Sequence, residues 1–165
     1  PTNNTMLRRS ALPRSGLFDP VFDRGSRADH DLGMRLHLSG ATLLYDPAVL
    51  VFHHHAPVGG LRTHGARAVT RASSRRSLTQ RNLPSVTQLY LGLRYATAEQ
   101  RREGRAINLF STMSTDGPAS RRVARVAAQA VLLPSTLRRN RGAQAEAEAL
   151  WRHRPEIPGL AHPTA

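Results

Sequence analysis

The sequence of 165 residues contains no cysteine and no lysine, and only 5% of its residues are aromatic. Without cysteine, the chain cannot form disulfides, thiolate metal sites or a cysteine nucleophile. No apolar run approaches the roughly 20 residues that a membrane-spanning helix needs. No basic head followed by an apolar stretch, the signature of a signal peptide, is visible either. We therefore expect a cytoplasmic protein.

Positive charge comes from arginine alone and is spread unevenly. The chain has 24 arginines against 11 acidic residues, a formal net charge of +13. Residues 1–61 hold six arginines and five acids, whereas residues 62–165 hold eighteen arginines and six acids. This asymmetry is typical of two parts with different tasks. We predict a compact domain over 1–62 and an Arg-rich, mainly helical extension with a flexible tail over 63–165.

Helix and strand signals alternate in the first part. Asp29 and Asp31 at one end and Gly40 at the other predict a helix over 29–39. A short apolar strand is expected over 41–45, followed by an Asp-Pro turn. The continuous apolar run over 48–52 has the length of a buried strand. The expected fold class of this part is α/β.

Helical periodicity dominates the second part. Pro84 and Ser85 are typical helix starters, and the helix they begin is expected to continue through Glu103. A second amphipathic helix is predicted over 123–133, ended by Pro134, and a last short helix over 143–151. The apolar face of the first helix consists of Val86, Leu89, Tyr90, Leu93 and Ala96.

Three features could carry chemistry. Asp29 and Asp31 stand at a helix start, where carboxylates are usually caps, although one that faces a cleft can act as a general base or a metal ligand. Three histidines, His53 to His55, end the second predicted strand, where a half-exposed polar terminus is the commoner case. Gly59-Gly60 before Arg62 allows the backbone close to a ligand and offers a guanidinium to a phosphate.

The order and spacing of these features resemble the C-terminal half of the GT-A catalytic domain in family 2 glycosyltransferases. The similar elements are Asn4, Arg8-Arg9, Gly16-Leu17-Phe18-Asp19, Ala28-Asp29-His30-Asp31-Leu32, Arg35, Gly40, Tyr45-Asp46-Pro47 and Phe52-His53. The resemblance implies a partial GT-A fold of the α/β class followed by a helical extension. It also implies sugar transfer from a nucleotide-sugar donor to a hydroxyl acceptor, which can be lipid-linked, in cell-envelope polysaccharide or glycolipid synthesis.

The resemblance assigns roles to individual residues. Asp29 corresponds to the catalytic base that deprotonates the acceptor hydroxyl, and Asp31 would support the site by orienting the loop or the acceptor. His53 corresponds to the strand-end histidine that can complete the coordination of a divalent metal, Mn or Mg. Arg62 is added on electrostatic grounds as a clamp for the diphosphate of the donor.

Two departures from the family pattern qualify these roles. Ala28 replaces the glutamate of the family motif, and the Asp-x-Asp metal motif of the nucleotide-binding half is missing. We therefore expect the chain to be either a fragment of a longer transferase or a remnant without activity. In isolation the chain should not catalyse sugar transfer. The metal is expected to bind only together with the missing nucleotide-binding half.

The alternative interpretation is a noncatalytic, basic binding module derived from a transferase, with an anionic membrane surface or nucleic acid as its partner. The arginines and the apolar face of Val86, Leu89 and Leu93 suit the surface of an anionic membrane, where the protein would lie on the cytoplasmic face. Nucleic acid is the less favoured partner. Arginine is not interleaved with aromatic residues, and no helix-turn-helix, zinc or RNA-binding signature occurs.

Overall fold

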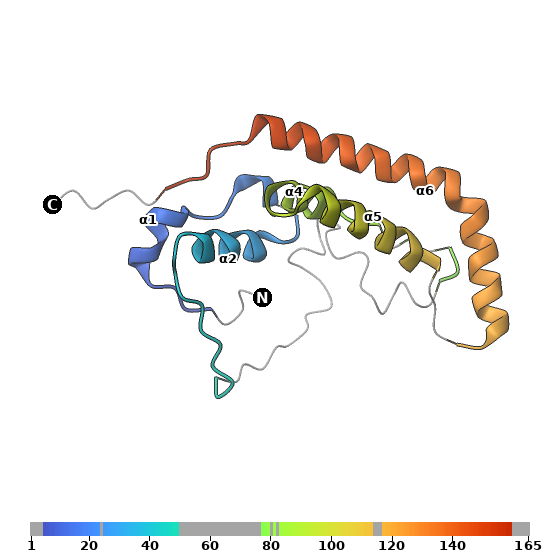
Figure 1. The fold of residues 1–165 in the computed structure, drawn as a ribbon, viewed down its shortest axis with the longest axis horizontal. Coiled ribbons are helices and arrows are strands. Elements are labelled where there is room, and N and C mark those ends of the chain that lie inside the picture. The colour runs from blue at the N-terminus through green and yellow to red at the C-terminus, as the bar shows by residue number, and fades with distance from the viewer. Residues whose placement is uncertain are drawn as a thin grey trace. The chain divides into compact units, whose positions relative to one another are not determined.

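The computed structural model describes residues 5–23, 25–49, 77–79, 81, 83–113 and 117–159. The chain divides into two compact units. The first comprises Pro1–His64 together with Pro155–Ala165, and the second comprises Gly65–Arg154. Every regular element among the described residues is a helix (Figure 1).

The first unit is built around α2, which spans Ala28–Leu38 and confirms the helix predicted there. It is preceded by the short helices η2 (Arg9–Ala11), α1 (Leu12–Ser15) and η3 (Pro20–Phe22). Asp19 starts η3, since its Oδ1 accepts a hydrogen bond of 2.9 Å from the Val21 amide. Phe22, Leu32 and Leu36 are buried and form the small apolar core of this unit.

The expected α/β fold, a partial GT-A domain, is wrong for the part of the chain that the structure describes. Residues 41–46 form no strand, although the following Asp-Pro turn is confirmed, with the Ala48 amide donating to Asp46 Oδ1 at 2.9 Å. A strand satisfies its backbone only by pairing with another strand, and residues 41–46 pair with no described segment as a strand does. Leu44 and Tyr45 are accordingly 89% and 90% exposed. Residues 50–52 of the second predicted strand lie outside the described residues.

The second unit is a helical assembly of α4 (Val86–Tyr95), α5 (Ala98–Met113) and α6 (Ala119–His153). Ser85 caps α4 as predicted, its hydroxyl accepting a hydrogen bond from the Gln88 amide. Both α4 and α5 pack against α6. Tyr90, fully buried, meets the Trp151 ring edge-on with 5.8 Å between ring centroids. This aromatic contact anchors α4 to the C-terminal half of α6.

A break between α4 and α5 replaces the continuous helix that was predicted through Glu103. The Gln100 amide donates to Thr97 Oγ1 at 3.2 Å, and the Thr97 amide donates to Gln100 Oε1 at 2.9 Å. This reciprocal pair is a capping box, which satisfies donors at the start of a helix. Ala96, in an extended conformation, ends α4 just before it.

The long helix α6 contains Pro134 in its interior, so the predicted end at this residue is wrong. The predicted short helix over 143–151 is part of the same element. A proline removes one backbone hydrogen bond and kinks a helix. The bend of α6 in Figure 1 agrees with this effect. Pro134 and Ala130, whose carbonyl would otherwise accept that bond, are both exposed, so water can solvate the carbonyl.

Two polar side chains of α6, those of Arg125 and Gln129, are buried where the helix contacts residues 77–79. Arg125 is 1% exposed, and its guanidinium donates to the Thr112 carbonyl at the end of α5, at 2.8 Å, and to the Ser77 carbonyl. Gln129 donates to the Leu78 carbonyl at 2.8 Å. Burial, together with the nearby Arg121, lowers the pKa of Arg125. These side chains fasten α5 and residues 77–79 to α6.

Candidate functional site

The first candidate site lies at the start of α2, where Asp29 stands in the first turn. The side chain of Asp29 is 26% exposed, so it is largely covered but reaches solvent. Residue 27, which precedes the helix, has a left-handed backbone with φ 84°, a conformation that arginine adopts only at a cost. The backbone is therefore strained next to the carboxylate that the sequence singled out.

Two side chains, those of His30 and Arg27, form a hydrogen-bonded series that ends at this carboxylate. Arg27 Nη1 lies 3.2 Å from His30 Nε2, and His30 Nδ1 lies 3.1 Å from Asp29 Oδ1. An ionised carboxylate can only accept, so His30 Nδ1 is the donor to Asp29.

The Asp29 carboxylate is ionised at neutral pH. Burial raises the pKa of Asp29, but its hydrogen bond with His30 and the attraction of positive charge outweigh burial and lower that pKa from 3.8 to about 2. A group that displaced His30 without donating a hydrogen bond of its own would remove one cause of the lowering. The basicity of Asp29 thus depends on what donates a hydrogen bond to it.

Asp31 serves a different purpose from Asp29. Its side chain is fully buried, and Arg35, one helical turn on, donates to its Oδ2 from Nε at 2.8 Å. The same guanidinium donates to the Leu17 carbonyl at 2.6 Å and to the Ser15 carbonyl. Asp31 and Arg35 therefore fasten α2 to Ser15, the last residue of α1, and to Leu17 just after it. We call this ion pair the clamp. In this arrangement Asp31 orients the polypeptide, and its carboxylate does not reach the surface.

The C-terminal segment contributes to the same region of the first unit. The Leu17 amide donates to the Pro158 carbonyl at 2.8 Å. Gly16 has φ 69°, and a Cβ there would lie 2.9 Å from Ile157 Cγ2. Only glycine combines this backbone with this close approach. Residues 157–158, distant in sequence, therefore pack beside the clamp.

The remaining predicted site residues cannot be placed. His53, the expected metal ligand, and Arg62, the expected diphosphate clamp, lie outside the described residues. Within the described ranges, no group of three or more histidine or acidic side chains stands close enough to hold a metal ion. The described residues thus do not build a site for the expected Mn or Mg ion.

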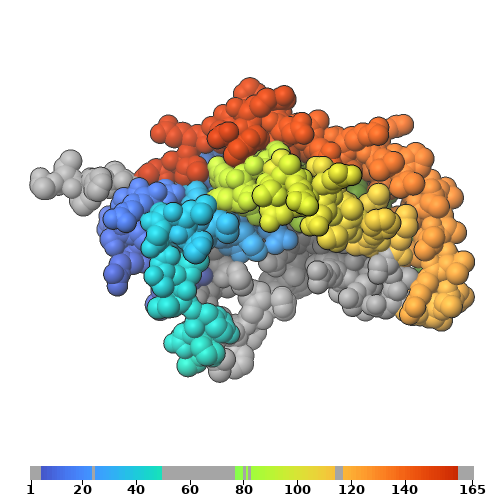
Figure 2. Space-filling model, viewed as in Figure 1, coloured from blue at the N-terminus to red at the C-terminus, as the bar shows by residue number. Residues whose placement is uncertain are grey.

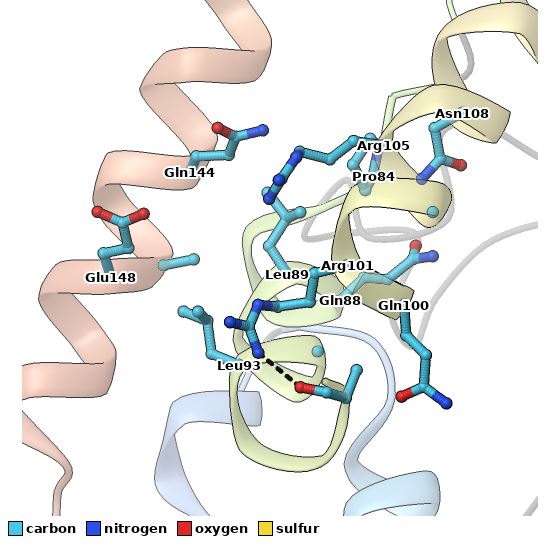
Figure 3. Close-up of a pocket in the computed structure, with 14 residues that line it drawn as sticks. Pro84, Gln88, Leu89, Leu93, Gln100, Arg101, Arg105, Asn108, Gln144 and Glu148 are labelled. Atoms are coloured by element: carbon cyan, nitrogen blue, oxygen red, sulfur yellow. Dashed lines mark hydrogen bonds between the residues drawn. The ribbon is translucent and has the colours of Figure 1, made fainter. Parts of the chain in front are cut away.

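The second candidate site is a pocket of about 170 Å³ in the second unit, between α4, α5 and α6. Figure 3 shows Arg101 and Arg105 of α5 reaching toward Gln144 and Glu148 of α6. Arg101 also donates to the Ala96 carbonyl at 2.5 Å. Leucine side chains of α4 supply an apolar wall. Glu148 is the single acidic residue of the lining, so the pocket holds no pair of carboxylates for acid–base catalysis.

Sequence reasoning missed the partners of the two aspartates. Arg35 was noted only as part of the family pattern, although its position four residues after Asp31 is the spacing of a helical ion pair. His30 likewise stood only within the family motif, and it is in fact the hydrogen-bond donor to Asp29. The contribution of Arg27 had no sequence signal, because it depends on an unusual backbone conformation.

Comparison with family models, with curated proteins and with solved structures finds no match for this chain. Among the described helices, none combines the length and the apolar content that crossing a bilayer requires.

Proposed function

We propose that this chain contributes the acceptor-activating part of a glycosyltransferase, which transfers sugar from a nucleotide-sugar donor to a hydroxyl acceptor. The observation that carries the proposal is the ionised, partly exposed carboxylate of Asp29 at the start of α2. It stands at the position where the resemblance to family 2 glycosyltransferases expects the base. An inverting transfer requires a carboxylate of this kind within hydrogen-bond reach of the attacking hydroxyl.

In the proposed reaction, the acceptor hydroxyl takes the place of His30 as the hydrogen-bond donor to Asp29. The acceptor oxygen forms a bond to the anomeric carbon, the bond from that carbon to the diphosphate breaks, and the hydroxyl proton passes to Asp29. The hydroxyl supplies a hydrogen bond to Asp29 in place of the one from His30, and the ionised carboxylate accepts its proton as the bond to the anomeric carbon forms.

Asp31 and Arg35 act in this proposal as positioning residues. They hold α2 against the carbonyl groups of Ser15 and Leu17, and thereby fix the turn that carries Asp29. A base must be held within a fraction of an ångström to act efficiently. The buried ion pair supplies that rigidity two residues away from the carboxylate that it serves.

The test is a transfer assay on the complete encoded protein, with whatever coding sequence precedes residue 1. The protein is incubated with a panel of nucleotide sugars and hydroxyl acceptors, and the glycosylated product is measured by mass spectrometry. Asp29→Asn should abolish product formation, whereas Asp23→Asn, which changes an exposed acid of the same unit, should not. Transfer that survives Asp29→Asn would refute the base assignment. Absence of any transfer would favour the noncatalytic binding module.

A further inference from the structure

The first part of α6, before Pro134, has two contrasting sides. Arg125 and Gln129 lie on the buried side, where they fasten residues 77–79. From residue 123 to residue 134 the opposite side is exposed and apolar, and we call it the outer strip. Its residues are Val123, Val126, Ala127, Ala130, Val131 and Pro134.

The outer strip is continuous along the helix. With about 100° of rotation per residue, its six side chains fall within an arc of about 140°. Val123, Val126 and Val131 are 68%, 47% and 81% exposed. Figure 2 shows this part of α6, in orange, at the surface of the molecule. Exposed apolar side chains gathered in one strip, unlike scattered ones, mark an interaction surface.

Arginines stand at both ends of the outer strip. Arg121 and Arg122 precede it, and Arg138, Arg139 and Arg141 follow it. No acidic residue occurs between 117 and 145. Arg122 donates to the Gly117 carbonyl at 3.2 Å, and the three arginines that follow the strip are exposed. The surface is therefore apolar in the middle and cationic at its ends.

This distribution matches an anionic bilayer better than other partners. Apolar side chains enter the boundary between headgroups and acyl chains, and arginines reach sideways to the lipid phosphates. Each arginine near such a surface contributes about 1 kcal/mol. Nucleic acid would use the arginines and leave the valines in water, because phosphate contacts need no apolar strip.

The other apolar faces of the second unit do not suit this role. Leu89 and Leu93, which the sequence suggested for membrane contact, line the pocket between α4, α5 and α6. Ile107 and Phe110 of α5 are exposed, but helical spacing places Glu99 and Glu103 on their side. Acidic neighbours oppose binding to an anionic surface.

We propose that the outer strip of α6, with the arginines at its two ends, docks this chain on the surface of an anionic lipid bilayer. The proposal concerns the second unit and is independent of sugar transfer at Asp29.

The test is co-sedimentation of the chain with vesicles of phosphatidylcholine, with and without phosphatidylglycerol. The double variant Val123→Asp/Val131→Asp should bind the anionic vesicles at least about tenfold more weakly than the unchanged chain. Arg138→Ala and Arg141→Ala, which change the two following arginines that helical rotation places on the side of the strip, should each weaken binding about fivefold. Ile107→Asp is the matched control, because it places the same charge on an exposed apolar site of α5, and it should bind like the unchanged chain.

Three results would overturn the proposal. One is equal pelleting with neutral and anionic vesicles, and another is undiminished binding by the double variant. The third is retention of random duplex DNA, at a salt concentration where the vesicles are not bound, which would assign the arginines to nucleic acid. Circular dichroism of each variant establishes that the helices are kept, so that a loss of binding reports on the surface.

Discussion

Replacing Arg35 with methionine removes the guanidinium that fastens α2 to the segment after α1. Methionine keeps much of the volume and the helix propensity of arginine. The Asp31 side chain is 0% exposed and the Arg35 side chain 12%, so water cannot easily replace the lost partner. The Ser15 and Leu17 carbonyls also lose a donor.

Removing one partner of a buried ion pair costs about 3–5 kcal/mol. The two carbonyl hydrogen bonds belong to the same guanidinium, so their loss is included in that figure rather than added to it. The double variant Asp31→Leu/Arg35→Met should recover most of the loss, because it leaves no buried charge without its partner. The coupling between the two residues therefore measures the clamp directly.

Amide hydrogen exchange of the full chain measures the local stability of this region. Exchange is followed by mass spectrometry of peptides from α1 to α2. Arg35→Met should speed exchange there about 100-fold or more, as a loss of about 3 kcal/mol requires. Arg14→Met, which changes an exposed arginine of α1, is the control and should have no effect. Exchange in Arg35→Met that rises less than about fivefold would refute the argument that the pair holds α2 in place.

Further predictions test other contacts. Gly16→Ala should destabilise the first unit by about 1–3 kcal/mol, seen as faster exchange in residues 12–17 and 155–159, whereas Gly33→Ala, with nothing near its Cβ, should not. Arg125→Leu should lower the free energy of unfolding of the second unit by about 3 kcal/mol, measured by urea denaturation with Trp151 fluorescence. Arg138→Leu should leave that free energy unchanged. The pKa of Asp29 falls from 3.8 to about 2 on folding, so its carboxylate should stabilise the folded chain above pH 3.8 and lose that contribution as the pH falls through about 2. In acid titrations, Asp29→Asn should flatten the dependence of stability on pH in this range.

Local signals in the sequence predict the helices well where caps and periodicity agree. The acidic first turn and Gly40 mark α2, and Ser85 marks the start of α4. The break before α5 was also readable, because Thr97 and Gln100 have the spacing of a capping box. The continuation of α6 through Pro134 was not, since it depends on packing of the helix on both sides of the bend.

Strand formation was the main failure of sequence reasoning, and the reason is physical. The run of residues 41–45 has the composition of a strand, but a strand exists only with a partner, and composition does not reveal whether one is present. The site shows the same contrast. Asp29 could be singled out from its position, whereas its link to His30 and the strain at Arg27 arise from the backbone alone.

The central claim is that the Asp29 carboxylate takes the proton of the acceptor. The most direct measurement compares the single-turnover transfer rate and the donor affinity of Asp29→Asn with those of the unchanged complete protein. We predict a rate lower by about 10²–10⁴-fold with the donor affinity unchanged, because a general base acts in the transition state and not on the bound donor. A variant that transfers sugar at the original rate, or one that loses rate and donor affinity together, would contradict the claim.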